Sequence, residues 1–181
     1  MSLNNSQFQK LFEQTGITIH IDSVTNYFVD NQTPMAIIYP KTIQELSTIL
    51  KIASKNHLKV VPSGGNSRMN LGNQINKIDL IISMSKLNNI LNHNPADLTV
   101  RVQSGITIQK FLQLLAQHYQ FVPIDPPLPD IATIGGTLAV GFTGPLKWMG
   151  GNLRDTVIGM TIVEADGTIV KTGGNVVKNV T

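Results

Sequence analysis

The sequence contains no cysteine and one tryptophan, and only 14% of its 181 residues are charged. The absence of cysteine excludes a disulfide scaffold, a thiolate zinc site, an iron–sulfur cluster held by this chain and a cysteine nucleophile. No run reaches the roughly 18 apolar residues of a membrane-spanning helix. The first residues, MSLNNSQFQK, lack the basic start and apolar centre of a signal peptide. We therefore expect a cytoplasmic protein with no transmembrane segment.

The charge of the chain is small and dispersed. Fourteen basic and eleven acidic residues give a formal net charge of +3. Nucleic-acid-binding proteins cluster Lys and Arg on one face or stripe, whereas here they are scattered, so no nucleic acid partner is expected. A hydrophobic fraction of 41% excludes disorder, and the length suits one domain or two small subdomains.

A strand–helix–strand pattern is the clearest feature of the first half. The apolar segment 34–40 predicts a strand. Thr42 and Glu45 form a T-x-x-E capping box, and apolar residues then recur at helical spacing. The segment 58–61 predicts a second strand, stopped by Pro62. Such a unit implies that its two strands pair in parallel.

Further elements follow along the chain. Strands are predicted at 78–83 and 98–102, with a polar, Asn-rich connection at 86–94 between them. A helix is predicted at 107–118 from its apolar face. Ala-Asp-Gly at 165–167, between two apolar runs, indicates a β-hairpin.

Two glycine-rich segments could bind a ligand through their backbone. The first glycine segment, 63–67, follows a predicted strand, where small residues let N–H groups converge on phosphate oxygens. The second, 132–145, has few charges, and as a buried loop it would need partners for its amides. The alternatives are a tight turn for the first and a glycine-rich core crossing for the second. We expect a side chain at Gly65 to weaken ligand binding while the fold survives.

The sequence carries no motif for a P-loop or Rossmann site, a serine nucleophile or a metal site. Neither glycine segment fits the P-loop or the Rossmann fingerprint, which leaves a dinucleotide held between two separate loops. No serine lies in a G-x-S-x-G motif. Trp148 is interpreted as a packing residue. The four histidines are isolated and have no metal-ligand spacing, so no metal is expected; they are His20, His57, His93 and His118.

Four motifs, in this order, resemble the FAD-binding domain of the vanillyl-alcohol oxidase / p-cresol methylhydroxylase family. They are P-x-A-I-I-Y-P-K-T-x-x-E-L at 34–46, V-V-P-S-G-G-N-S at 60–67, D-P-P with A-T-I-G-G-T-L-A-x-G-x-T-G at 125–144, and G-N-L-R-D-x-V-I-G-M-x-I-V-x-A-D-G-x-I-V at 151–170. Within that family the chain is similar to the FAD-binding subunits of bacterial glycolate oxidases.

The resemblance implies an α+β fold with two subdomains and FAD extended between them. The first subdomain would have parallel strands with helices, and the second would be mainly antiparallel. Residues 1–33 would be an N-terminal extension and 34–181 the FAD-binding domain, with subdomains of about 34–103 and 104–181. The C-terminal substrate domain of the family is expected to be absent, so no catalytic residue is named.

The resemblance also implies which residues bind FAD. Residues of the first glycine segment would hold the pyrophosphate, and the others would line the cofactor and its adenine and flavin walls. The set is Ser63, Gly64, Gly65, Asn66, Ser67, Gly135, Gly136, Thr137, Ala139, Gly141, Thr143, Gly144, Gly151, Ile162 and Val163. Some relatives attach FAD through a histidine directly after the paired glycines, where this chain has Asn66. FAD is therefore expected to be non-covalent.

The function implied is oxidation of a 2-hydroxy acid such as glycolate by hydride transfer to FAD, with this chain alone inactive. The resemblance alone also implies an iron–sulfur partner subunit that takes up the electrons, since this chain has no cysteine to hold a cluster. Two alternatives stay open. One is a non-catalytic flavin-binding or assembly module, and the other is a truncated remnant that binds no cofactor.

Overall fold

The computed structural model describes residues 5–13, 15–20, 29–142, 144–151 and 153–174. The chain separates into two compact units, each made of segments distant in sequence. The first unit comprises Met1–Ser63, Arg68–Lys86 and Ile162–Val170, and the second comprises Gly64–Ser67, Leu87–Thr161 and Lys171–Thr181. No helix within the described ranges is long and apolar enough to cross a membrane.

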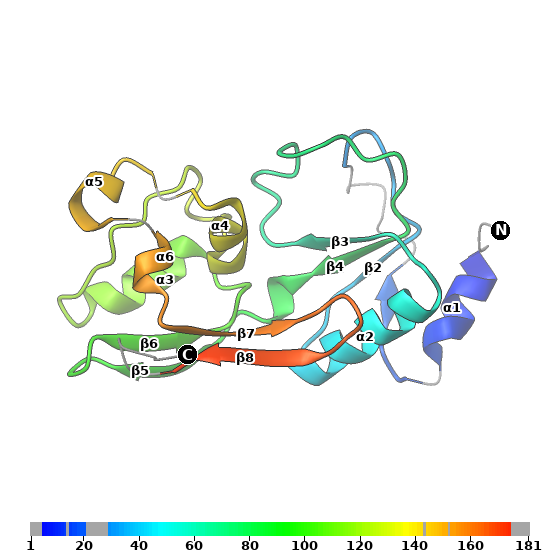
Figure 1. Ribbon diagram of the computed structural model, residues 1–181, viewed down its shortest axis with the longest axis horizontal. Helices are drawn as coiled ribbons and strands as arrows, with labels where there is room; N and C mark the ends of the chain where they lie inside the picture. The colour runs from blue at the N-terminus through cyan, green and yellow to red at the C-terminus, as the bar shows by residue number, and fades with distance from the viewer. Residues whose placement is uncertain (1–4, 14, 21–28, 143, 152, 175–181) are drawn as a thin grey trace. The chain divides into compact units, whose positions relative to one another are not determined.

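A four-stranded sheet in the order β1–β2–β4–β3 forms the first unit (Figure 1). Its strands are β1 (Ile19–His20), β2 (Ala36–Ile38), β3 (Val60–Ser63) and β4 (Leu80–Ser83). β2 and β3 each pair with β4 in parallel, and β1 pairs with β2 antiparallel. The two strands of the predicted strand–helix–strand unit, β2 and β3, therefore run parallel as expected, but they do not pair with each other, because β4 lies between them. Every residue of β4 is buried, as suits a central parallel strand.

The burial of this sheet follows from its sequence. Ile37 and Ile81, from neighbouring strands, pack with Val29 and Ile78 in one core cluster. Pro62 lies in β3, at the edge of the sheet, where it pairs in register with β4. An edge strand tolerates proline because one side of its backbone needs no ladder hydrogen bond.

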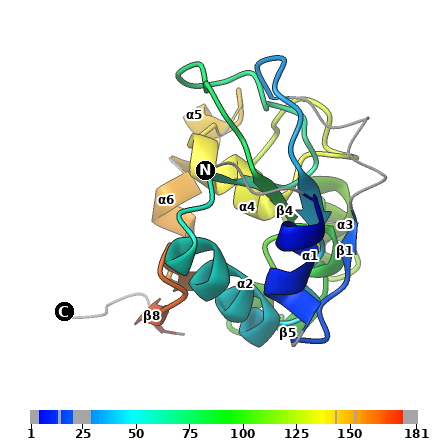
Figure 2. The ribbon, with the colours of Figure 1, turned by 90° about the vertical axis from the view of Figure 1, so that its right-hand side faces the viewer.

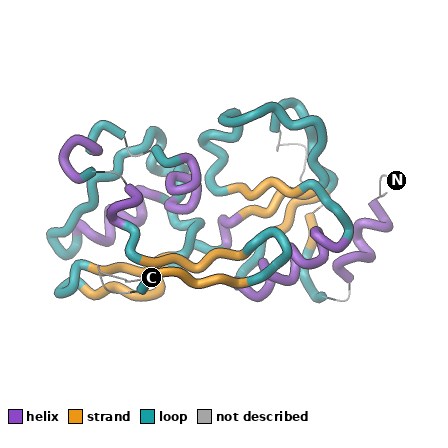
Figure 3. Tube along the Cα trace, viewed as in Figure 1, coloured by secondary structure: helices purple, strands orange, loops and turns teal. Residues whose placement is uncertain are grey.

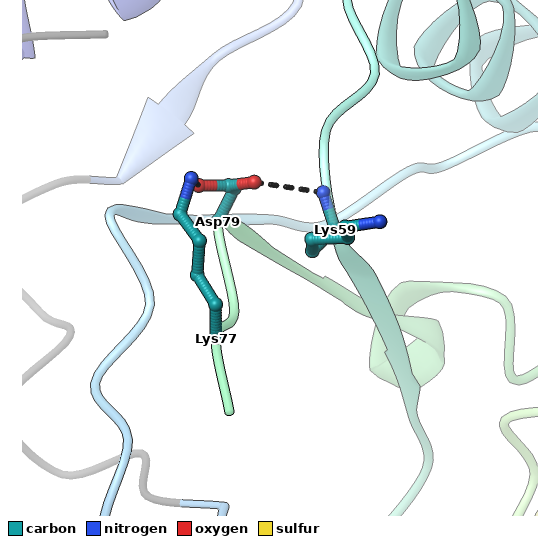
Figure 4. A network of polar contacts seen from close by, with 3 residues as sticks. All are labelled: Lys59, Lys77 and Asp79. Carbon is teal, nitrogen blue, oxygen red and sulfur yellow. Dashed lines mark hydrogen bonds and ion pairs between the residues drawn. The ribbon is translucent and has the colours of Figure 1, made fainter. Parts of the chain in front are cut away.

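A polar contact fixes the entry to β3 and β4 (Figure 4). The Asp79 side chain is 4% exposed; its Oδ2 accepts a 2.8 Å hydrogen bond from the Lys59 backbone N–H. Its Oδ1 lies 2.8 Å from Nζ of Lys77, whose side chain is 57% exposed. The buried Asp79 carboxylate thus binds the backbone of the residue that precedes β3, and Asp79 itself directly precedes β4.

Two helices complete the first unit, α1 (Asn5–Glu13) and α2 (Ile43–Lys55). Figure 2 shows them side by side. The predicted cap of α2 is confirmed: Thr42 Oγ1 accepts from the Glu45 N–H at 3.1 Å, and Glu45 Oε2 accepts from the Lys41 N–H at 2.7 Å. The Glu45 carboxylate thus binds the backbone of Lys41, the residue before the N-cap Thr42.

The second unit begins with an antiparallel hairpin of β5 (Ile90–Asn94) and β6 (Thr99–Val102), which follows a 3₁₀ turn at Met84–Lys86. The prediction of a polar connection at 86–94 is wrong, since it contains β5. Two of the five β5 residues, Leu91 and Asn92, are exposed, so the strand lacks the apolar alternation that marks a half-buried strand.

Helices make up most of the rest of the second unit. α3 (Ile108–Ala116) buries Ile108, Phe111 and Leu115, as its apolar face predicted. The segment 132–145 is not a continuous loop, because it contains α4 (Ile134–Val140). Two single-turn helices follow, α5 (Lys147–Gly150) and α6 (Leu153–Thr156).

The predicted hairpin is confirmed as β7 (Gly159–Val163) and β8 (Ile169–Gly173), drawn as two long orange strands in Figure 3. Its turn closes with hydrogen bonds from Glu164 N–H to Thr168 O and from Gly167 N–H to Glu164 O, both 2.9 Å. Ser47 Oγ of α2 donates to Gly167 O at 2.5 Å, so the turn belongs to the first unit. Parallel strands in one unit and antiparallel hairpins elsewhere confirm the α+β class.

Candidate functional site

The two glycine segments meet inside the second unit. A Cβ atom on Gly64 would fall on Thr133 Oγ1, and one on Gly65 would fall on the carbonyl oxygen of Ile131. Only glycine lets the backbone approach this closely. The structure therefore brings together two segments that lie more than sixty residues apart in the sequence.

This contact corrects the expectation for Gly65. A side chain there would strike the Ile131 backbone, whose carbonyl cannot turn aside as a flexible side chain could. A substitution at Gly65 must therefore disturb the protein itself, whatever it does to a ligand. The loop is more than an isolated tight turn, since it packs against the start of the second glycine segment.

The second glycine segment is organised by α4. Thr133 caps the helix by accepting from the Gly136 N–H at 3.2 Å, and Gly141 ends it with a left-handed φ of +68°. The Gly135 N–H donates to Ser104 O at 2.8 Å, and a Cβ there would come within 2.7 Å of the Ser104 Cβ. The glycine at 135 thus permits packing against the residues before α3.

Asp125 is a functional candidate that the sequence reasoning did not name as a site residue. Its Oδ1 accepts from the Leu146 N–H at 3.1 Å, and a Cβ on Gly144 would fall on the same oxygen. Gly144 has a φ of +82°, which favours glycine. Asp125 therefore holds the end of the second glycine segment, and the D-P-P motif was the available signal.

The remaining predicted residues occupy varied positions. Ser63 is buried at the end of β3, Asn66 has a left-handed φ of +59° that asparagine tolerates, and Ser67 is half-buried. Thr137 is buried and Ala139 exposed, both in α4. Thr143 lies outside the described residues. Gly151 ends α5 with a φ of +79°, and β7 contains Ile162 and Val163.

The structure corrects the interpretations of Trp148 and of two histidines. Trp148 is 94% exposed, so its interpretation as a packing residue is wrong. His93 and His118 are not isolated, since their rings meet edge to face with centroids 4.7 Å apart, and His93 Nε2 lies 3.0 Å from Gln120 Oε1. Across the described part of the chain, no group of three or more potential ligand side chains could hold a metal ion.

Two glycines of α4 and its C-terminal end have few protein atoms beside them. A Cβ on Gly136 would meet one atom within 4 Å, Thr133 Oγ1 at 3.1 Å, and one on Gly141 would meet none. Packing within the protein therefore leaves the space next to Gly141 open, whereas the Thr133 hydroxyl lies close against Gly136. Neither glycine segment carries the P-loop or the Rossmann fingerprint, so the pair of segments fits neither of those nucleotide-binding classes.

The family follows from comparison with known proteins. Residues 34–173 match the family model described as "FAD binding domain", so the chain belongs to that family and FAD is its cofactor. The open space beside Gly141 leaves the backbone there accessible to such a cofactor.

Similar proteins include two curated relatives. The chain is 33% identical over 147 residues to glycolate oxidase subunit GlcD of Bacillus subtilis, covering 81% of this chain and 31% of that protein. It is 34% identical over 152 residues to D-lactate dehydrogenase [cytochrome] 1 of Saccharomyces cerevisiae, covering 82% of this chain and 25% of that protein. The chain thus spans about a third or less of these relatives.

The fold is shared with p-cresol methylhydroxylase, as the sequence motifs predicted. The match has a TM-score of 0.68 at 17% identity and covers 93% of this chain and 34% of that chain. At this identity the comparison establishes the fold alone. The predicted fold family and the predicted cofactor are both confirmed.

Proposed function

We propose that this chain is the FAD-binding portion of a flavin-dependent oxidoreductase that oxidises a 2-hydroxy acid such as glycolate. The observation that supports it most directly is the packing of Gly64 and Gly65 against Ile131 and Thr133, which joins the two glycine segments expected to hold the cofactor. Two relatives bear names that refer to glycolate and D-lactate, both of which are 2-hydroxy acids.

The residues expected from the motifs are proposed as the FAD site. Backbone groups of 63–67 would hold the pyrophosphate, and Gly136 and Gly141 would line the cofactor, the latter where no protein atoms fill the space. Gly135 and Gly144 would act by letting the chain pack closely at Ser104 and Asp125. FAD supplies the hydride acceptor when bound, and the protein supplies binding and orientation.

FAD is proposed to bind without a covalent bond. Asn66 follows the paired glycines, and its amide can form hydrogen bonds but cannot be alkylated by the flavin as an imidazole can. The chain has no cysteine to serve instead. Occupancy should then depend on the free FAD concentration by mass action.

The electrons are proposed to pass to an iron–sulfur partner subunit. The support is the resemblance to the FAD-binding subunits of bacterial glycolate oxidases; this chain has no cysteine that could hold such a cluster itself. The alternative is a flavin-binding module that assembles with other subunits without reacting itself. Both would bind FAD, so only turnover separates them.

The test of the FAD site is a titration followed by flavin fluorescence. Gly136→Leu should weaken FAD binding at least tenfold, about 1.4 kcal/mol, because its side chain would occupy the open space beside α4. Gln113→Leu, on an exposed position of α3, is the matched control and should bind FAD as the wild type does. Melting temperatures of the apoproteins separate lost affinity from lost folding. Unchanged affinity in Gly136→Leu would favour the core-crossing alternative.

The test of the reaction is reduction of bound FAD. Dithionite should reduce it in this chain alone, whereas glycolate and D-lactate should reduce it only with the remaining part of the enzyme and its partner present. Rapid reduction by glycolate with this chain alone would contradict the proposed absence of catalytic groups. No reduction by either acid in the full assembly would favour the assembly module.

A further inference from the structure

One side chain touches both glycine segments. Thr133 is 4% exposed and lies between the Gly64 backbone and the first turn of α4. A Cβ added to Gly64 would meet three of its atoms, first Oγ1, then Cβ at 3.4 Å and Cγ2 at 3.5 Å. Gly64 therefore packs against the whole Thr133 side chain.

The same hydroxyl also fixes α4. Thr133 Oγ1 accepts from the Gly136 N–H at 3.2 Å, and a Cβ on Gly136 would lie 3.1 Å from this oxygen. One oxygen atom thus determines how far the Gly64 backbone and the Gly136 backbone lie from one another. Apart from its chain neighbours and the backbone of its own helix, Gly136 has only Thr133 within 4 Å of its Cβ position among the described residues.

The backbone of Thr133 is itself immobilised. Thr133 forms a β-bridge with Thr107, and its carbonyl accepts from the Thr137 N–H at 2.9 Å. The preceding residue, Ala132, is part of a core cluster with Ile108. A β-branched side chain on so fixed a backbone has few rotamers available. The separation between the two glycine segments is therefore set by a rigid spacer.

We propose that Thr133 is a positioning residue, which holds the two glycine segments at the separation that the pyrophosphate of FAD requires. This inference rests on the proposed FAD site. Binding groups must be held to within about 0.5 Å of the productive geometry, which demands support of this kind from residues that do not touch the ligand. Thr133 acts through Gly64 and Gly136 and needs no contact with the cofactor.

The experiment compares two substitutions that keep most of the side chain. Thr133→Val has nearly the same shape but no acceptor for the Gly136 N–H, whereas Thr133→Ser keeps the hydroxyl. FAD and ADP are titrated separately, because ADP has the pyrophosphate but no flavin. Thr133→Val should lose at least tenfold in affinity for both ligands, and Thr133→Ser should stay within about threefold of the wild type.

Thr42→Val is the matched control, because Thr42 caps α2 of the first unit through the same kind of hydrogen bond. It should lower the melting temperature of the apoprotein much as Thr133→Val does, without changing FAD affinity. Wild-type affinity in Thr133→Val would overturn the proposal. So would an equal loss in Thr133→Ser, or an equal loss in Thr42→Val. A wild-type chain that binds neither FAD nor ADP would instead refute the FAD site itself.

Discussion

Gly65 lies so close to the carbonyl oxygen of Ile131 that no Cβ atom fits between the two residues. The contact joins a loop that follows β3 to the residues that precede α4. It explains why glycine is required at position 65 even before a cofactor is considered. The glycines of this protein therefore fall into two groups, those that permit packing and those that border open space.

The first prediction separates these groups by stability. Gly65→Ala should destabilise the apoprotein by about 1–3 kcal/mol, as overpacking does, because the backbone of Ile131 must shift. Gly136→Ala meets only a side-chain oxygen at 3.1 Å and should cost less. Thermal melting without FAD measures both. Equal melting temperatures for the two variants would show that the loop can move away from Ile131.

The second prediction concerns Asp125, which holds the Leu146 N–H at 3.1 Å. Asp125→Ala should release the end of the second glycine segment and weaken FAD binding several-fold, which a fluorescence titration would detect. Asp125→Asn keeps an oxygen acceptor and should lie between Asp125→Ala and the wild type. If Asp125→Ala binds FAD as tightly as the wild type, the hydrogen bond from Leu146 to Asp125 does not contribute to FAD binding.

The third prediction concerns the buried carboxylate of Asp79 (Figure 4). Asp79→Ala should lower the free energy of unfolding by about 2 kcal/mol, because the partly buried Lys59 N–H loses its hydrogen-bond partner. Lys77→Met removes only an exposed ion-pair partner and should cost at most about 1 kcal/mol. Urea denaturation of both variants tests this order. A larger effect at Lys77 would contradict it.

The fourth prediction is a pH dependence at the hairpin turn. Hydrogen bonds from Thr168, one from its N–H at 2.8 Å, hold the pKa of Asp166 below its ordinary value of 3.8. The folded state therefore favours the carboxylate. Its stabilising contribution is fully present above pH 3.8 and is lost as the pH falls through the lower folded pKa. An NMR titration of the Asp166 carboxyl should give a midpoint below 3.8, and an unshifted midpoint would contradict it.

The fifth prediction is that FAD is released by acid. Because Asn66 stands where some relatives of this family carry a histidine, precipitation with acid should leave the yellow flavin in the supernatant. The washed pellet should be colourless. Flavin that stays with the pellet would show a covalent bond to another residue of the chain.

Local signals in the sequence were sufficient for several elements. The capping box at Thr42 predicted the start of α2, and the apolar face predicted α3. α4 was missed because the adjacent glycines Gly135 and Gly136 are poor helix formers, and its stability comes from packing and capping. The start signal at Thr133 and the stop signal at Gly141 were nevertheless present.

Relations between distant segments could not be read from local patterns. Nothing in the sequence of β2 or β3 specifies that β4 separates them. The two glycine segments were recognised from their composition, but their contact through Gly65 was not, because it depends on the path of the whole second unit. Asp125 was missed as a site residue for the same reason.

The hydrogen bond from Ser47 Oγ to Gly167 O spans 120 residues, and almost all of the second unit lies between its ends. Closing a flexible loop of that length would cost about 4 kcal/mol of chain entropy. During synthesis, the contact of α2 with the turn at Gly167 cannot form until the intervening residues have been synthesised. If the second unit condenses first, it shortens the flexible chain and lowers that cost. The connectivity thus leaves the first unit, although it begins first, incomplete until its last segment, Ile162–Val170, has followed most of the second unit out of the ribosome.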